Sequence, residues 1–255
     1  EGLGLLKSSH YTGLLGTLGR LLGYLGLAGL FGGVLLIAVA WKDGVEYVLT
    51  VKHLWLAWGA AVIGCLLTVA TAAADVSGVS IARGLVPTEW TDLLDSTFGK
   101  ALVIRLLAVI GCAWVAARPE KVVDPTSRLM ALGAPAIALA TYGWSRQSAG
   151  VSVLAIPAGI AHVAAGAAWF GGAALLTRVV LAGPGDRDLV LAIRGFRRIY
   201  LPAVLVVLLS GAVQTSILLG GAGNMTSTTF GRIFLLKIVV VAAMAFVATA
   251  NRQYA

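Results

Sequence analysis

Residues 97–105 read TFGKALVIR and residues 229–237 read TFGRIFLLK, so one short pattern occurs twice, 132 positions apart. Each stretch starts with Thr-Phe-Gly and places one basic residue three positions after the Thr and a second eight positions after it. The second basic residues, Arg105 and Lys237, stand inside long apolar segments. A cation at membrane depth costs on the order of 3 kcal/mol, so it usually faces a partner or a water-filled cavity. The repeated cation therefore predicts a polar site inside a membrane.

The composition is typical of an integral membrane protein. Of the 255 residues, 59% are hydrophobic and 12% are charged, against about 25% charged residues in globular domains. The net charge of +8 comes from basic residues that lie mostly at the ends of apolar segments, which indicates membrane topology and not nucleic-acid binding. Two cysteines are too few for a disulfide scaffold. We expect no intact signal peptide, because no charged region is followed by a cleavage site.

The apolar segments predict an all-α, polytopic helical bundle. A helix needs about 20 apolar residues to cross the hydrocarbon core. The fourth segment is the shortest and contains Pro135, so we expect a kinked or tilted helix there. The seven candidate spans are approximately residues 21–41, 54–74, 98–117, 129–144, 153–180, 199–219 and 233–250.

The distribution of Lys and Arg predicts the orientation. Eleven lie on one side of the predicted spans and six on the other, so the first side is expected to be cytoplasmic, with the N-terminus outside and the C-terminus inside. The eleven are Lys42, Lys52, Arg118, Lys121, Arg128, Arg178, Arg187, Arg194, Arg197, Arg198 and Arg252, and the six are Lys7, Arg20, Arg83, Lys100, Arg146 and Arg232.

The repeat extends beyond the Thr-Phe-Gly stretches. Phe-Gly-Gly occurs at 31–33 and at 170–172, and the Gly64 and Thr68 spacing recurs at Gly211 and Thr215. We predict two parallel three-helix repeats, residues 21–117 and 153–250, joined by a linker helix over 129–145 and preceded by an external segment, 1–20. Paired repeats commonly place a site at their interface. A chance match of short apolar strings is the alternative.

Depth along the helices predicts a polar cavity open to the outside. At ~1.5 Å per residue, Arg105 and Lys237 lie roughly 12 Å below the outer surface. His162, nine residues into its span, lies at about the same level. Gln214 is expected in the outer half of its helix and Asp75 at the rim. The alternative is that the cations extend outward to lipid headgroups.

Soft side chains suggest copper as the metal. Cys112 and Met244 are separated by the repeat offset of 132, Cys65 lies near mid-membrane, and Met225 is in an outer segment. Together with His162 they supply the thiolate, thioether and imidazole groups that select Cu(I). The alternative is that Cys and Met fill packing gaps. A second axial histidine for haem is lacking within the spans, and no catalytic set is suggested by spacing, so we expect no enzyme.

These residues resemble the membrane domain of the copper-resistance protein D (CopD) family over residues 21–252. His162, followed seven positions later by Trp169 and then Phe-Gly-Gly, is similar to the family's H…W-x-G-G element. Residues 194–211 look like its Arg-Phe helix, which ends in a Ser/Thr-Gly pair. Residues 229–237 with Asn251-Arg252 resemble its T-x-(Y/F)-G-R…L-L-K…N-R signature, and 97–105 its upstream counterpart.

The resemblance implies an external N-terminus and the inward movement of copper from an external donor protein. His162, Trp169, Arg105 and Lys237 would be signature residues. Two departures stand out: residues 144–149 read WSRQSA where the family commonly has Gly-His-Ala, and seven spans are predicted where the family usually has eight.

Three functions follow as hypotheses. The first is copper transport across the cytoplasmic membrane, with copper as the bound ion and a site open to the outside. The second is an accessory or assembly subunit of a membrane complex, such as a copper-dependent oxidase, without transport. The third uses the cations Arg105 and Lys237 to hold an anion such as a lipid phosphate or the carboxylate of a small molecule. Expected partners are membrane lipids and either the donor protein or the membrane complex.

Overall fold

The computed structural model describes residues 10–145, 154–180, 186–219, 224–229, 231–236 and 238–239. The chain divides into two units, Glu1–Gly211 and Ala212–Ala255, and each is described by itself. The second unit contains the end of α9 and the short α10 (Asn224–Ser227).

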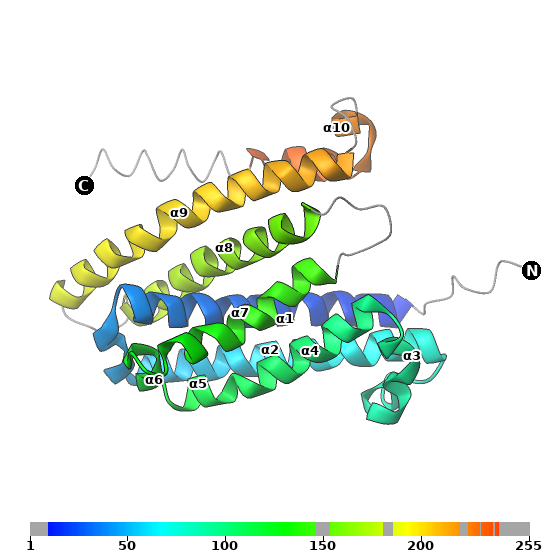
Figure 1. Cartoon of the computed structure of the whole chain (residues 1–255), viewed down its shortest axis with the longest axis horizontal. Helices are drawn as coiled ribbons and strands as arrows, with labels where there is room; N and C mark the ends of the chain where they lie inside the picture. The colour runs from blue at the N-terminus through cyan, green and yellow to red at the C-terminus, as the bar shows by residue number, and fades with distance from the viewer. Residues whose placement is uncertain are drawn as a thin grey trace, which may run out of the picture. The chain divides into compact units, whose positions relative to one another are not determined.

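The described residues form helices and connecting turns, without a strand. In the first unit α1, α2, α4 and α7 lie side by side, and α8 packs on α1 and α7 (Figure 1). The long helices are α1 (His10–Val39), α2 (Val48–Ser77), α4 (Thr97–Gly111), α7 (Arg128–Trp144), α8 (Ala155–Leu175) and α9 (Asp186–Leu219). The short elements are η1 (Lys42–Glu46), η2 (Arg83–Leu85), η3 (Pro87–Trp90), α3 (Thr91–Leu94), α5 (Ala113–Ala117), α6 (Glu120–Val123) and the π-helical turn η4 (Leu176–Val180).

Five stretches of the described helices are long and apolar enough to cross a membrane, which confirms the predicted all-α membrane bundle. The fourth predicted span is α7, whose 17 residues with Pro135 inside extend roughly 25 Å, less than the ~30 Å hydrocarbon core. Most of the seventh predicted span, 233–250, lies outside the described residues. The five stretches are Gly13–Val39, Val48–Ser77, Thr97–Ala117, Ala155–Val179 and Val190–Ile217.

The first helix begins at His10, well before the predicted start of the first span at residue 21. The reason is packing, because Gly16 and Gly19 of α1 lie against Thr71 and Thr68 of α2. Further along the same contact the two backbones nearly touch. A Cβ added to Gly64 would lie 2.1 Å from the backbone nitrogen of Gly23, so no larger residue fits without separating the helices.

The two Phe-Gly-Gly stretches, at 31–33 and 170–172, pack directly against each other where α1 crosses α8. A Cβ added to Gly32 would lie 2.5 Å from the backbone nitrogen of Gly172, and one added to Gly171 would lie 2.9 Å from the Cα of Gly32. Such a reciprocal contact between equivalent residues is what a two-fold relation between the repeats would produce. The duplication itself stays a prediction.

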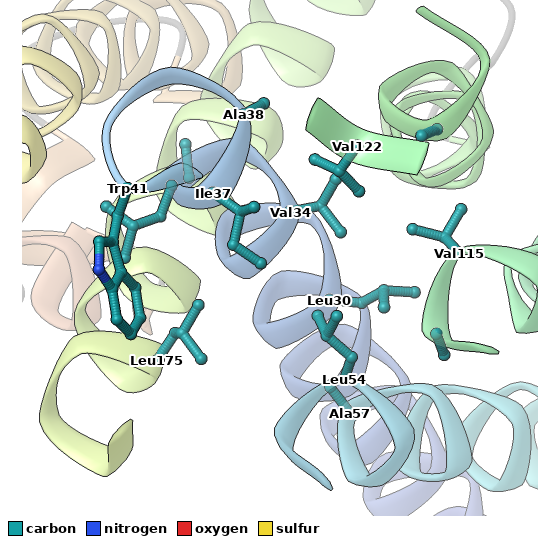
Figure 2. Close-up of a cluster of buried hydrophobic side chains, with 14 of the residues drawn as sticks. Leu30, Val34, Ile37, Ala38, Trp41, Leu54, Ala57, Val115, Val122 and Leu175 are labelled. Atoms are coloured by element: carbon teal, nitrogen blue, oxygen red, sulfur yellow. The ribbon is translucent and has the colours of Figure 1, made fainter. Parts of the chain in front are cut away.

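Buried side chains form two apolar clusters within the first unit. The first lies toward the end of α1, which supplies Leu30, Val34 and Ile37 (Figure 2). Its other members come from α2, α5, α6, α7, α8, η4 and α9 and from the connecting residues Trp41 and Cys112. The second contains Leu27 of α1, Cys65 of α2 and Leu106 of α4. Apolar side chains also face outward, which suits contact with lipid tails.

Candidate functional site

A pocket of about 260 Å³ lies where α1 begins, α2 ends and α4 begins. We call it the α1–α2 pocket. Its lining combines glycines, apolar side chains, hydroxyls and two opposite charges. Asp75, predicted at the rim of a cavity, lines this pocket, and Arg105 is not among its lining residues. The lining residues are Gly13, Gly16, Arg20, Thr68, Thr71, Ala72, Asp75, Val76, Leu93, Ser96 and Phe98.

The hydroxyls from α2 present acceptors to the α1–α2 pocket. Thr68 Oγ1 donates to the Gly64 carbonyl at 2.7 Å, and Thr71 Oγ1 donates to the Leu67 carbonyl at 2.8 Å. Because each hydroxyl hydrogen is used within the helix, the oxygen lone pairs remain available to a ligand. With the carboxylate of Asp75, this wall of the pocket offers oxygen acceptors, whereas Arg20 of α1 brings a positive charge to the same pocket.

Arg105 is buried against α7 instead of facing the pocket. Its side chain is 4% exposed, and its Nε donates to Thr141 Oγ1 at 2.8 Å. The guanidinium carbon lies 3.4 Å from the centre of the Tyr142 ring, which is a cation–π contact. Thr141 in turn donates to the Ala138 carbonyl at 2.6 Å, so its oxygen is fixed as an acceptor for Arg105.

Cys65 and Tyr142 place a thiol and a phenol beside this cation. Tyr142 packs against the buried apolar cluster that contains Cys65 of α2 and Leu106, the residue after Arg105 on α4. A Cβ added to Gly23 of α1 would lie 3.5 Å from both the Tyr142 hydroxyl and the backbone nitrogen of Cys65. Four helices therefore converge on one polar group within an apolar interior. We call Cys65, Arg105, Thr141 and Tyr142 the Arg105 cluster.

His162 on α8 is held by the part of α9 that belongs to the first unit. Its Nδ1 lies 3.1 Å from the Val207 carbonyl oxygen and 3.2 Å from Ser210 Oγ. Ser210 donates its own hydrogen to the Val206 carbonyl, so both neighbours of Nδ1 are acceptors. Nδ1 therefore carries a hydrogen, so whenever this imidazole is neutral its lone pair is on Nε2. The ring lies over Gly211, whose lack of a side chain leaves room for it.

The soft ligands predicted for copper do not come together among the described residues. Cys65 and Cys112 are both free and buried, and they belong to different apolar clusters. Within the described part of the chain no group of three or more His, Cys, Asp or Glu side chains could hold a metal ion. Trp169 packs near Tyr200, with the ring centres 6.1 Å apart, and does not line the α1–α2 pocket.

Comparison with known families gives two matches. A family model described as Copper resistance protein D-like, N-terminal domain, matches residues 12–151, and one described as Copper resistance protein D matches residues 190–255. The chain belongs to the copper resistance protein D family. No curated protein and no solved structure matched the chain.

Membership in the copper resistance protein D family makes the chain a multi-pass copper-resistance membrane protein, in agreement with the five apolar helical stretches. The first match includes the α1–α2 pocket and the Arg105 cluster. His162 and Trp169 lie between the two matched segments, at positions that neither match covers.

Several predicted site residues fall outside what the structure places. Lys237 and Met244 lie outside the described residues, and so does the side chain of Met225 on α10. Gln214 belongs to the unit Ala212–Ala255, which is described by itself. A common cavity of Arg105, Lys237 and His162 therefore stays a prediction.

Sequence reasoning missed the partners of Arg105. Thr141 and Tyr142 are adjacent polar residues near the end of the short, otherwise apolar α7, and that pairing was the available signal. Arg20 was assigned only to topology, yet it lines the α1–α2 pocket.

Proposed function

We propose that this protein carries copper ions across the cytoplasmic membrane, inward from the side on which α1 begins. The observation that carries the proposal is the α1–α2 pocket, in which the Asp75 carboxylate and the oxygens of Thr68 and Thr71 offer acceptors to a cation, with the Arg20 guanidinium as the one opposing charge in its described lining. Membership in a copper-resistance family supplies the identity of the cation. In this proposal copper is cargo, and no covalent chemistry is catalysed.

The deeper copper ligand in this proposal is His162. Its Nδ1 hydrogen bonds fix the tautomer that carries a lone pair on Nε2, the form in which imidazole binds metals. Cys65, on the same helix as Asp75 and about 15 Å away at ~1.5 Å per residue, is the soft ligand nearest to the pocket along α2.

Copper uptake by proteoliposomes tests the access route. The full chain is reconstituted, an external Cu(I) chelate is added, and internal copper is measured by mass spectrometry. Asp75→Asn removes the negative charge from the pocket lining and is expected to lower the initial uptake rate about tenfold. The matched control, Asp92→Asn, removes an exposed acid close to the pocket that does not line it, and should leave uptake unchanged. Equal rates in the two variants would overturn the route.

The orientation in this proposal places the N-terminus outside and the C-terminus inside. Thr88 and Thr126 are exposed residues in the predicted outer and inner connections. Single Thr88→Cys and Thr126→Cys variants report the orientation because the native cysteines are buried. A membrane-impermeant maleimide should label position 88 in intact cells and position 126 only after lysis. The opposite pattern would reverse the topology and the transport direction.

An accessory subunit of a membrane complex is the second candidate. It is favoured by residues 144–149, which read WSRQSA where the resemblance leads one to expect Gly-His-Ala, so one candidate histidine ligand is replaced. A purified wild-type protein that binds no copper but retains specific partner chains would support this function over transport.

A further inference from the structure

Two opposite charges line the α1–α2 pocket without pairing with each other. Arg20 of α1 and Asp75 of α2 are both exposed lining residues. The ion pairs among the described residues are Arg83–Glu89 and Lys121–Asp124, so neither lining charge has a charged partner there. A pocket that holds an unpaired cation and an unpaired anion suits a ligand that carries both charges.

The packing of α1 against α2 determines the order of these two charges along the bundle. The helices run antiparallel, and a Cβ added to Gly16 would lie 3.1 Å from Thr71 Oγ1. From this contact Asp75 is four residues toward the end of α2, and Arg20 is four residues in the opposite direction along α1. Their Cα atoms are therefore about 12 Å apart along the helix axes. Arg20 Nη2 donates to Thr17 Oγ1 at 3.1 Å, one turn back, which brings its charge to roughly 7 Å from that of Asp75 along the axis.

The two charges lie at the levels of a phospholipid headgroup. The 30 residues of α2 extend about 45 Å, as far as the hydrocarbon core and both headgroup layers together. Asp75 precedes the last residue of α2 by two positions, so it lies in the headgroup layer, and the Arg20 guanidinium lies near the boundary with the hydrocarbon. In an ethanolamine phospholipid the phosphate is attached next to the acyl chains and the ammonium lies further out. The phosphate therefore meets Arg20, and the ammonium meets Asp75.

We infer that the α1–α2 pocket binds the headgroup of a phospholipid with a primary ammonium, with phosphatidylethanolamine as the probe. Three N–H groups of the ammonium match the Asp75 carboxylate and the Thr71 oxygen, one turn below it on α2. The guanidinium of Arg20 retains donors for the phosphate beyond its bond to Thr17. A choline headgroup has no N–H group and is bound by cages of aromatic rings, whereas Phe98 is the one ring in the described lining. A phosphatidylglycerol headgroup has no cation for Asp75.

The pocket has room for a headgroup, and its surroundings suit acyl chains. Its volume is about 260 Å³, and a Cβ added to Gly13 in its lining would meet no atom within 4 Å. Leu14, Leu18 and Leu21 form an exposed stripe on α1 beside the lining residues, and this stripe extends from the pocket toward the bilayer interior. Acyl chains that lie along these leucines keep the headgroup at the pocket, an attachment that a soluble zwitterion lacks.

The test is native mass spectrometry of the purified full chain in detergent, without copper, in an equal mixture of phosphatidylethanolamine, phosphatidylcholine and phosphatidylglycerol with identical acyl chains. The wild type should retain phosphatidylethanolamine about tenfold over phosphatidylcholine, the factor expected for a charge-assisted hydrogen bond. Arg20→Gln should lose most of this lipid, and Asp75→Asn should retain phosphatidylglycerol equally well. The matched control Lys100→Gln removes an exposed cation near the start of α4 that does not line the pocket, and it should behave as the wild type. Equal retention of the ethanolamine and choline lipids by the wild type, or unchanged retention in Arg20→Gln, overturns the inference.

A second variant fills the pocket without changing its charges. Gly13→Leu adds a side chain where a Cβ meets no atom within 4 Å, so the fold should be kept while retention of phosphatidylethanolamine falls severalfold. Retention at the wild-type level in this variant overturns the inference. Displacement of the lipid by an equal concentration of free phosphoethanolamine overturns the lipid as the occupant. Because copper is absent from these measurements, their failure leaves the copper uptake assay unaffected, and a failed uptake assay leaves the lipid preference standing.

Discussion

Replacing Gly171 by alanine should separate α1 from α8 and destabilise the bundle. The added Cβ would lie 1.8 Å from the Ala28 carbonyl oxygen, where ordinary contacts begin near 3.4 Å. The backbones must therefore move apart by roughly 1.5 Å, and the neighbouring contact with Gly32 opens with them. Overpacking of this kind typically costs about 1–3 kcal/mol, which lowers the ratio of folded to unfolded protein about 5- to 150-fold.

The assay is unfolding of the purified protein in mixed micelles with an increasing fraction of dodecyl sulfate, followed by tryptophan fluorescence. Gly59→Ala is the matched control, because a Cβ at Gly59 in α2 meets no atom within 4 Å. Alanine is the better helix former, so this control should be neutral or more stable by roughly 0.5–1 kcal/mol. If Gly171→Ala and Gly59→Ala unfold at the same detergent fraction, the close crossing at the two Phe-Gly-Gly stretches is refuted.

Two further predictions concern polar contacts. Thr141→Val leaves the Arg105 Nε unpaired and should lower the free energy of unfolding by about 1–3 kcal/mol. The control Thr177→Val removes an exposed hydroxyl that bonds only to carbonyls of the preceding helical turn, so it should change the free energy of unfolding far less. Equal losses for the two variants in the same unfolding assay would contradict the role of Thr141. Hydrogen bonds from the backbone and the hydroxyl of Thr126 hold the pKa of the Asp124 carboxyl below its ordinary value of 3.8. The stability that the Asp124 carboxylate adds is therefore present above pH 3.8 and is lost as the pH falls through the lower folded-state pKa. A carboxyl ¹³C NMR titration of Asp124 with its midpoint at or above pH 3.8 would contradict the lowered pKa.

The architecture was accessible from sequence because its determinants are periodic and local. Apolar length located the long spans, and the glycines at 32, 64 and 171 proved to be points of close backbone contact between helices. The start of α1 at His10 could not be predicted from the sequence. It depends on Gly16 and Gly19 meeting α2, a contact that hydropathy alone does not contain.

The site was accessible only in part. Depth along a helix predicted Asp75 at the rim of a cavity, and Asp75 lines the α1–α2 pocket, but depth says nothing of the direction in which a side chain points. Arg105 was therefore assigned to a cavity, whereas it lies against Thr141 and Tyr142 on a helix distant in sequence. Cys112 was grouped with Cys65 by type, and packing places the two thiols in separate clusters.

The central claim, that copper is the cargo, is tested most directly by the copper bound to the purified full chain after equilibration with Cu(I). The wild type should bind near-stoichiometric copper, and His162→Ala, which removes the imidazole held by Val207 and Ser210, should lose most of it. Absence of copper from the wild type, or equal copper in the two proteins, would contradict the account.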